Sequence, residues 1–359
     1  MTSRTLIRPT GFVDSPFGHD GKVARLAGGM NWFGLVELIR VDGHRRVGSE
    51  LVPVEGIEQR FDDAMTADWV RITGQRAQLQ MGERTIRLDQ PQVMGIVNTT
   101  PDSFSDGGAY ADAAGAAESG AEMAAAGAAI IDVGGESTRP GATTVWEEDE
   151  IERVLPVVKQ LSAGGHAVSI DSRKSGVMNA ALGAGATLVN DVSALTWDPL
   201  SAGVVAAAGA PVVLMHHQGD PTTMQDAPRY DDALVEVFLW LEDRIAAAEK
   251  AGIKRDRILV DPGIGFGKSV AHNLELMNGL SLLHGLGCPI VLGASRKRMI
   301  GALANEAPAD KRLPGSLALA LKAVEQGAQV VRVHDVPETV QALKIWRGLR
   351  DAALTPKSF

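Results

Sequence analysis

The sequence lacks the features that mark secreted and membrane-spanning proteins. Its 359 residues include one cysteine, Cys288, which excludes an internal disulfide. Because this cysteine precedes Pro289 at the start of an apolar run, we expect a buried, unreactive thiol. No apolar run approaches the roughly 20 residues needed to cross a bilayer. The N-terminus also lacks the apolar segment of a signal peptide, so we expect a cytoplasmic protein and no membrane partner.

Basic residues are in the minority. The chain has 35 Lys and Arg against 44 Asp and Glu, a formal net charge of −9. This balance argues against a nucleic-acid partner. An anionic substrate must then be held by a local group of basic side chains, because the overall field repels it.

From residue 93 onward one unit recurs: a short apolar run, a polar tip and an Ala- or Leu-rich helical stretch. Continuous apolar strands that alternate with helices indicate an α/β protein with a parallel sheet buried on both faces. Eight such units predict a (β/α)8 TIM barrel, whereas the alternative, a doubly wound open sheet, is expected to have fewer strands. The predicted strands are 93–97, 129–133, 167–170, 187–189, 211–215, 258–260, 289–292 and 329–333. The predicted helices are 111–126, 147–161, 175–182, 231–251, 271–283, 313–325 and 337–349.

The segment before the barrel is less informative. From Arg76 to Leu88, apolar and polar residues alternate on both sides of Gly82, which predicts a β-hairpin at the bottom of the barrel. We therefore divide the chain into an N-terminal extension, 1–75, of unknown role and a barrel, 76–359. Within the extension, 30–40 has strand-like content and 57–69 is a candidate helix. An added structural layer under the barrel, an oligomerisation segment and a partly flexible arm are all open at this stage.

Every predicted strand ends in a polar or ionisable residue. Any one of them alone is explained by a helix cap or a solvated carboxylate. A barrel, however, gathers all its strand ends into one mouth, so we expect a single site. In order, these residues are Asn98, Asp132 with Glu136, Asp171, Asn190 with Asp191, His216, Asp261, Ser295 to Lys297, and Arg332 with His334.

The acidic and amide residues indicate a ring-binding pocket. Asp171, Asn190 and Asp261 close apolar strands and should be partly buried, where a carboxylate needs partners. A heterocycle with donor and acceptor edges supplies them, and Lys297 and Arg332 can flank such a ring.

A second group has the chemistry of an anion site. It comprises Asn98, Arg139, Arg332 and His334. Arginine and histidine at strand ends suit a phosphate or pyrophosphate. Asn98 together with phosphate oxygens would suit Mg²⁺, which takes few protein ligands.

Two other motifs fail on spacing. His216-His217 lacks further ligands at the intervals that zinc sites use. Residues 261–269 have Pro262 where a P-loop needs its first glycine, and Lys268 where the dinucleotide fingerprint needs its last.

Taken together, eight ordered motifs resemble those of the dihydropteroate synthase family. The resemblance covers roughly residues 76–359 and says nothing about the extension. The motifs are N-T-T-P-D-S-F-S-D-G-G (98–108), G-G-E-S-T-R-P-G-A (134–142), S-I-D-S (169–172), V-N-D-V-S-A-L (189–195), L-M-H-H-Q-G-D-P-T-T-M-Q (214–225), D-P-G-I-G-F-G-K (261–268), G-A-S-R-K (293–297) and R-V-H-D (332–335).

The resemblance implies a reaction of folate biosynthesis. The pyrophosphate ester of 6-hydroxymethyl-7,8-dihydropterin loses pyrophosphate to leave a pterin cation, which the amine of p-aminobenzoate attacks to give 7,8-dihydropteroate. It also implies Mg²⁺ as cofactor, inhibition by sulfonamides and a homodimer.

The same resemblance assigns residues to the substrates. The implied pterin site consists of Asp171, Asn190, Met215, Asp261, Lys297 and Arg332. The implied pyrophosphate site consists of Asn98, Arg139, Arg332 and His334, with Asn98 also on the metal. The implied p-aminobenzoate site consists of Phe104, Thr138, Pro140, Phe266 and Ser295, with Asp106 closing over it. The implied catalytic residues are Asp171, Asp261, Lys297, Arg139 and Asp106.

Two other functions share part of this pattern. A methyltetrahydrofolate methyltransferase barrel would have the same pterin pocket without a pyrophosphate site, and an inactive paralogue would bind pterin as a regulator or scaffold. Arg139, Arg332-x-His334 and Ser295-Arg-Lys297 favour the synthase over the methyltransferase. The paralogue would have substituted loop residues, whereas Asn98, Asp106, Thr138, Arg139 and Lys297 are all present. His217 stands where methionine is expected in much of the family, at a position able to tune substrate contacts.

Overall fold

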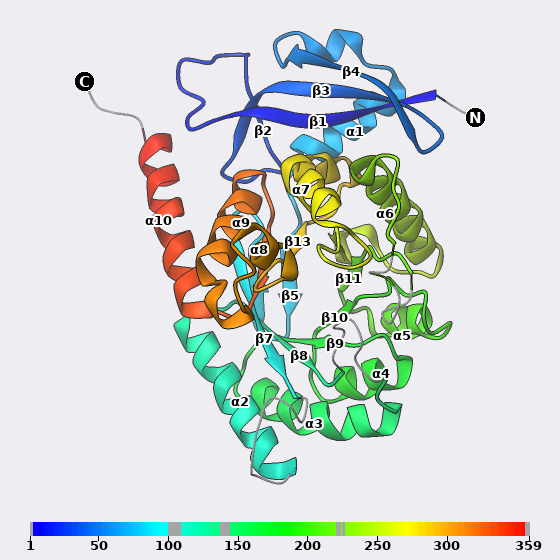
Figure 1. Cartoon of the computed structure of the whole chain (residues 1–359), viewed down its shortest axis with the longest axis vertical. Helices are drawn as coiled ribbons and strands as arrows, with labels where there is room; N and C mark the ends of the chain where they lie inside the picture. Colours follow the sequence, from blue (N-terminus) through cyan, green and yellow to red (C-terminus); the bar gives the residue numbers. More distant parts are fainter. Residues whose placement is uncertain (1–2, 100–108, 137–143, 220–223, 225–226, 356–359) are drawn as a thin grey trace.

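Eight parallel strands form the barrel that the apolar runs predict (Figure 1). The computed structural model describes residues 3–99, 109–136, 144–219, 224 and 227–355. The strand order is β12-β11-β10-β9-β8-β7-β14-β13, and a parallel bridge between Val260 and Ile290 closes the ring. The open-sheet alternative is therefore excluded. The strands are β7 (Gln92–Asn98), β8 (Ile130–Gly134), β9 (Val168–Asp171), β10 (Leu188–Asp191), β11 (Val212–Met215), β12 (Ile258–Asp261), β13 (Val291–Leu292) and β14 (Val330–Val333).

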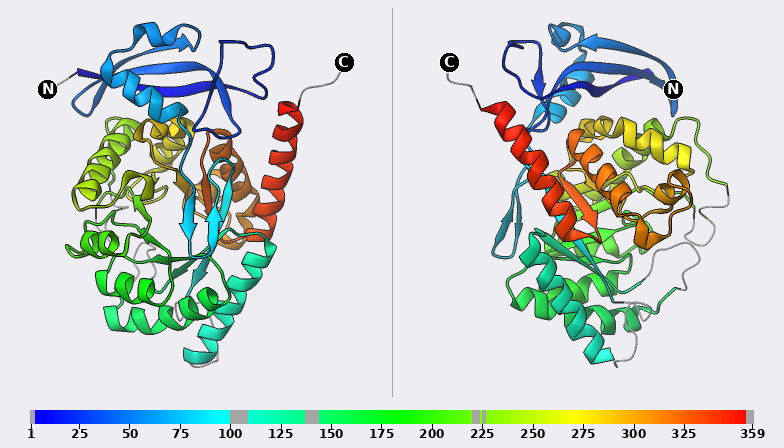
Figure 2. Two further views of the ribbon diagram at one scale, coloured as in Figure 1. Left: turned by 180° about the vertical axis from the view of Figure 1, so that it is seen from behind. Right: turned by 60° about the vertical axis from the view of Figure 1, so that its left-hand side comes forward.

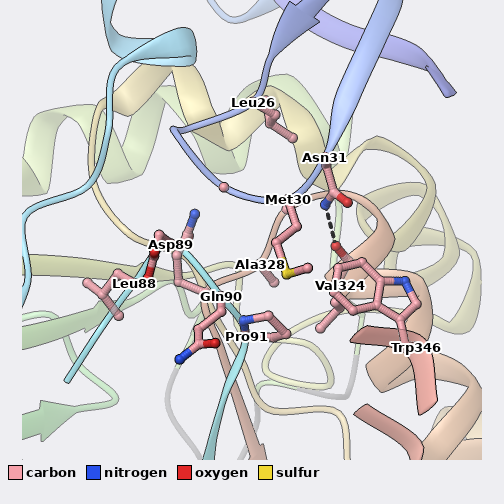
Figure 3. A pocket seen from close by; sticks show the side chains of 13 residues that line it. Leu26, Met30, Asn31, Leu88, Asp89, Gln90, Pro91, Val324, Ala328 and Trp346 are labelled. Atoms are coloured by element: carbon pink, nitrogen blue, oxygen red, sulfur yellow. Dashed lines mark hydrogen bonds between the residues drawn. The ribbon is translucent and has the colours of Figure 1, made fainter. Parts of the chain in front are cut away.

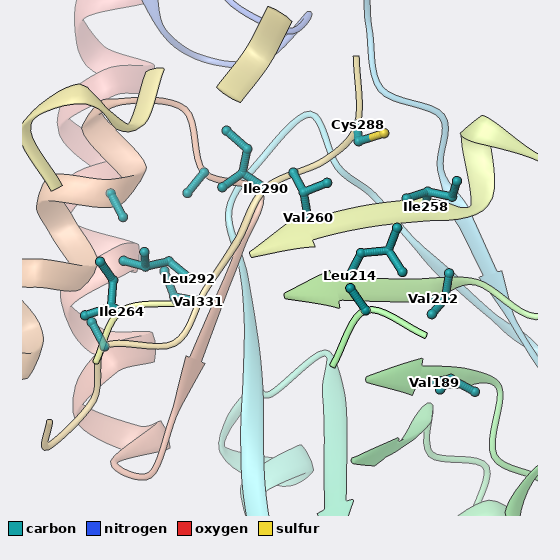
Figure 4. Close-up of a cluster of buried hydrophobic side chains, with 14 of the residues drawn as sticks. Val189, Val212, Leu214, Ile258, Val260, Ile264, Cys288, Ile290, Leu292 and Val331 are labelled. Atoms are coloured by element: carbon teal, nitrogen blue, oxygen red, sulfur yellow. The ribbon is translucent and has the colours of Figure 1, made fainter. Parts of the chain in front are cut away.

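Helices surround this ring, and alternate strand residues pack against them. Val212 and Leu214 of β11 point outward into the main apolar core, while Val213 between them points inward. Figure 4 shows part of the outer cluster, including Cys288, whose pKa burial raises to about 12. This thiol is buried, as predicted.

All seven predicted helices are present, with three differences. The helices are α2 (Ala109–Ala126), α3 (Glu147–Ala163), α4 (Ser175–Gly183), α5 (Ser201–Ala208), α6 (Ala233–Lys250), α7 (Val270–Gly279), α8 (Arg298–Leu303), α9 (Leu313–Glu325) and α10 (Val336–Leu354). The sequence pattern does not predict α5 and α8, because eight and six residues are too few to display a helical period. The predicted helix 271–283 is α7 followed by the 3-10 helix η4 (Leu280–Leu286). No helix within the described ranges is both long and apolar enough to span a membrane.

The predicted hairpin is present as β5 (Leu79–Met81) and β6 (Arg84–Ile86), joined at Gly82, which has φ +61°. Its buried side chains meet one inward-facing residue from the lower end of each barrel strand. This closed apolar layer makes the barrel bottom a solid base. It consists of Leu79, Met81, Ile86, Leu88, Met94, Ile130, Ala167, Leu188, Val213, Leu259, Val291 and Val330.

The extension folds into a further layer that packs along one side of the barrel, over η4 and α6 (Figures 1 and 2). Its antiparallel sheet contains β1 (Ser3–Val13), β2 (Ala24–Arg25), β3 (Trp32–Asp42) and β4 (Arg45–Pro53). The strand and helix expected here correspond to β3 and to η1 (Ile57–Arg60) with α1 (Asp63–Thr73). One face of the sheet packs on α1 through residues such as Phe33 and Val36, and Leu6 and Ile39 of the same sheet join the barrel core.

Replacing Met81 by alanine should destabilise the fold by about 2–5 kcal/mol, because the side chain is 1% exposed and fills the base of the barrel. Urea unfolding followed by circular dichroism measures the change. The matched control is Glu83→Ala, at an exposed turn position two residues away, which should stay within about 0.5 kcal/mol. Equal effects for the two variants would contradict a packed base.

Candidate active site

The polar strand ends meet at the barrel end opposite the β5–β6 hairpin. Asn98, Gly134, Asp171 and Asn190 are register partners on the four neighbouring strands β7 to β10. Register partners on adjacent strands lie only about 4.8 Å apart. Gly134 has no side chain, and the Asp171 Cβ lies only 3.5 Å from where its Cβ would be. This row forms one polar side of the site.

Arg332, on β14, is held by two carboxylates from the facing strands. Its Nε donates to Asp132 Oδ2 at 2.5 Å, and its Nη2 donates to Asp171 Oδ2 at 2.6 Å. Asn190 Nδ2 also donates to Asp132 Oδ2, at 2.9 Å. The side chain of Asp132 is fully buried, whereas Asp171 and Arg332 retain 11% and 21% exposure. Asp171 and Arg332 are therefore partly accessible, and both are held in place by the buried Asp132 side chain or its partner.

The opposite wall carries the second acid and the lysine. Asp261, at the end of β12, accepts a hydrogen bond from Gly263 N at 2.7 Å. Lys297 Nζ donates to the carbonyl oxygen of Ile264 and lies 4.5 Å from the centroid of the Phe266 ring. A Cβ placed on Gly293 would lie 3.6 Å from Asp261 Oδ2 and 3.9 Å from the Arg332 side chain. The two walls therefore converge on one space.

Burial and mutual attraction set the charges of this group. Burial raises the pKa of Asp171 to about 7, although Arg332 acts to lower it and Asp132 acts to raise it. Burial also raises the pKa of Asp261, while Lys297 opposes that rise. The pKa of Lys297 falls to about 8 because burial disfavours the ammonium, and Asp261 limits the fall. Each acid thus faces a cation, and the protonation states of the set depend on one another.

Three further predicted residues lie on this rim. Met215 is 5% exposed at the end of β11, in register with Asp261. Ser295 Oγ accepts a hydrogen bond from His334 N at 3.3 Å and lies 3.1 Å from His334 Nδ1. The structure therefore brings Asp171, Asn190, Met215, Asp261, Phe266, Ser295, Lys297, Arg332 and His334 together with Asn98 at the strand ends. Phe104, Asp106, Thr138, Arg139 and Pro140 lie outside the described residues.

His216 and Lys268 have a structural arrangement instead of a ligand-binding one. Lys268 Nζ is buried, lies 2.8 Å from His216 Nδ1 and donates to the carbonyl oxygens of Gly263 and Phe266, both at 3.0 Å. This lysine connects the loop that carries Phe266 to the end of β11 by hydrogen bonds. Within the described ranges no three His, Cys, Asp or Glu side chains gather into a metal cluster.

A separate pocket lies at the other end of the barrel and plays no part in this site. It is formed where the extension meets the barrel bottom, between Met30, Asn31 and the segment Leu88–Pro91 (Figure 3). Asn31 Nδ2 donates to the carbonyl oxygen of Val324 there, at 2.7 Å. The polar groups at this pocket fasten the extension and are distant from the strand ends.

Sequence reasoning assigned no role to Asp132. A signal was present, because a carboxylate that interrupts the apolar run I-I-D-V-G must be buried with a partner. What the sequence does not reveal is which cation from a distant strand provides the pairing.

Comparison with known proteins agrees with this geometry. A family model described as pterin binding enzyme matches residues 94–334. The dihydropteroate synthase of Escherichia coli K12 is 47% identical over 262 residues, which are 73% of this chain and 92% of that relative. The synthase of Xanthomonas albilineans, solved with 4-aminobenzoic acid, is 48% identical, has a TM-score of 0.72 and covers 76% of this chain and 98% of its own. The Yersinia pestis synthase, solved as a sulfonamide drug complex, is 44% identical with a TM-score of 0.73, and the match covers 77% of this chain and 100% of its own.

The chain belongs to the pterin-binding enzymes and, within them, to the dihydropteroate synthases, which are transferases of the folate pathway.

Proposed function

We propose that the strand-end site binds 6-hydroxymethyl-7,8-dihydropterin pyrophosphate and transfers its pterin-methyl group to the amine of p-aminobenzoate. The C–O bond to pyrophosphate breaks first, and its electron pair leaves with pyrophosphate. The amine nitrogen then forms a bond to the same carbon and loses one proton. The observation that carries the proposal is the pairing of buried acids with Arg332 and Lys297 in one strand-end cluster.

The acidic wall suits the ring. Asp171, Asn190 and Asp261 offer oxygen acceptors for ring N–H groups, and Met215 adds an apolar contact. As the C–O bond breaks, positive charge develops on the pterin. Two carboxylates already fixed beside it stabilise that charge without reorganising, which is the most effective form of electrostatic catalysis.

The basic residues suit the departing anion. We assign Arg332, His334, Asn98 and Arg139 to the pyrophosphate. Asn98 offers a single amide oxygen, and no cluster of His, Cys, Asp or Glu ligands accompanies it among the described residues. That donor set fits Mg²⁺, which keeps most of its ligands as water and phosphate oxygens. When bound, the ion would neutralise charge on the leaving group.

The remaining residues suit p-aminobenzoate. We assign Phe266 and Ser295, together with Phe104, Thr138 and Pro140, to its ring and carboxylate, and Asp106 to closing the site. An aniline nitrogen is a neutral nucleophile and needs no strong base, so a Ser-His-Asp or Cys-His arrangement is not required. Sulfonamides share the outline of p-aminobenzoate and should compete for this place.

The direct experiment supplies dihydropterin pyrophosphate and Mg²⁺ and measures pyrophosphate release with and without p-aminobenzoate. Formation of 7,8-dihydropteroate supports the synthase. Pterin binding without any product would instead favour the inactive paralogue. Methyl transfer from methyltetrahydrofolate would favour the methyltransferase.

Asp171→Asn should lower kcat by roughly 10²- to 10³-fold, because the amide keeps the shape but removes a charge that stabilises the developing cation. Steady-state kinetics of dihydropteroate formation measures it. The control is Asp198→Asn: this carboxylate accepts hydrogen bonds from Ser175 N and Leu200 N, outside the site, and its loss should leave turnover near normal. Near-normal turnover in Asp171→Asn would count against the charge role.

The pH profile of kcat/KM for the pterin substrate should be bell-shaped, with limbs near pH 7 and pH 8. Activity rises as Asp171, with a pKa of about 7, loses its proton and gains the useful negative charge. It falls as Lys297, with a pKa of about 8, loses its proton and its positive charge. Lys297→Arg, which cannot deprotonate in this range, should remove the alkaline limb. A profile flat from pH 6 to pH 9 would refute these assignments.

A further inference from the structure

We infer that Asp132 is a positioning residue for the reaction: its buried carboxylate fixes both the Arg332 guanidinium and the Asn190 amide in the orientations that the pterin site needs. This inference rests on the proposed function and adds a residue to which neither the motifs nor the strand-end chemistry assigned a role.

Asp132 is buried below the strand ends that form the site. Asp132 lies within β8, two residues before the strand ends at Gly134, and its side chain is fully buried. It is therefore one level below the rim that Asp171 and Asn190 occupy. A carboxylate enclosed at this depth is costly unless it has partners. Because it lies below the rim, it supports the groups that face the substrate from beneath.

Asp132 also fixes the orientation of the Asn190 amide. Asp132 Oδ2 can only accept, so the group that faces it at 2.9 Å must be the NH₂ of the amide. The amide oxygen of Asn190 is then turned away from Asp132. One buried carboxylate thus decides that Asn190 presents an acceptor to the ring, which is the polarity needed by a ring N–H group.

Asp132 and Asp171 together fix the orientation of the Arg332 guanidinium. Asp132 takes Nε and Asp171 takes Nη2, so the planar guanidinium is held at two points on different strands. Without Asp132 the only carboxylate bonded to Arg332 among the described residues is Asp171. The guanidinium would then be free to rotate, and Asp171 would carry the whole pairing.

The Asp132 charge also affects the protonation of Asp171. The charged groups that act on Asp171 come from every side: Arg332 on β14, Asp132 on β8, Glu150 on α3 and Asp191 on β10, with Lys297 after β13. The charge of Asp132 acts to raise the pKa of Asp171. Removing only that charge should therefore move the acid limb of the pH profile to lower pH, which a purely structural role would not do.

The test is Asp132→Asn, which can keep an oxygen where Oδ2 accepts from Arg332 and Asn190 while removing the charge. We expect KM for dihydropterin pyrophosphate to rise by about tenfold or more. We also expect KM for p-aminobenzoate to change little, and the acid limb to shift downward. Fluorescence titration with 7,8-dihydropteroate should show the same weakening without turnover. The double variant Asp132→Asn/Asn190→Ala should lose less than the sum of the two single changes.

The matched control is Glu150→Gln. Glu150 is also fully buried, with Oε2 on Lys174 Nζ and Oε1 without a partner among the described residues, but it contacts neither Arg332 nor Asn190. It should lower the free energy of unfolding and leave KM for the pterin substrate unchanged at a pH above the acid limb, although its charge also acts to raise the pKa of Asp171.

If Asp132→Asn does not fold, Asp132→Ser takes its place in the same assays, because serine also removes the carboxylate. Wild-type kinetics and an unmoved acid limb in a folded variant would overturn the inference. An inactive wild-type protein would overturn the proposed function instead.

Discussion

A buried cation between two acids is the constraint on which the site depends. Asp132 and Asp171 project from neighbouring strands, and without Arg332 between them their charges would repel in a region with little water. Such a bridge stabilises little in total, because removing charges from water costs about as much as their attraction returns. Losing one partner, however, leaves an uncompensated buried charge. The bridge therefore ties β8, β9 and β14 together at the strand ends, where the site residues lie.

The rest of the barrel makes this arrangement tolerable. Acids with raised pKa values and a lysine with a lowered one are features that a stability-optimised protein would avoid. At the opposite end, the hairpin and one side chain at the lower end of each strand make an apolar layer in which every member is buried. Stability is thus concentrated at the base and chemistry at the mouth, which is the general division of a TIM barrel.

The sequence predicts the barrel well because each strand is buried on both faces and reads as an uninterrupted apolar run. It predicts the convergence of Asp171, Asp261, Lys297 and Arg332 because parallel strands end at one rim. It does not predict the pairing of Arg332 with Asp132, since side-chain contacts 200 positions apart leave no local signal. Lys268 illustrates the same limit: the glycine-rich motif around it resembles a phosphate loop, yet its ammonium is occupied by His216 and backbone carbonyls. The extension is least predictable because its sheet buries apolar residues on both faces, one against α1 and one against the barrel.

The matched parts of the relatives correspond to about three quarters of this chain and to nearly the whole of their own, and the family match begins at residue 94, after the extension. Specific contacts attach the extension to the barrel. Arg4 reaches both Asp68 of α1 and Glu242 of α6, and Arg46 donates to Asp232 at 2.5 Å. Asp232 is the N-cap of α6, where its other oxygen accepts from Val235 N. Just before this cap, Tyr230 OH donates to the carbonyl oxygen of Gly267, in the loop that carries Phe266. Two hydrogen bonds and the short chain segment between Tyr230 and Asp232 therefore link the extension to a loop of the site, so the extension braces one side of the barrel.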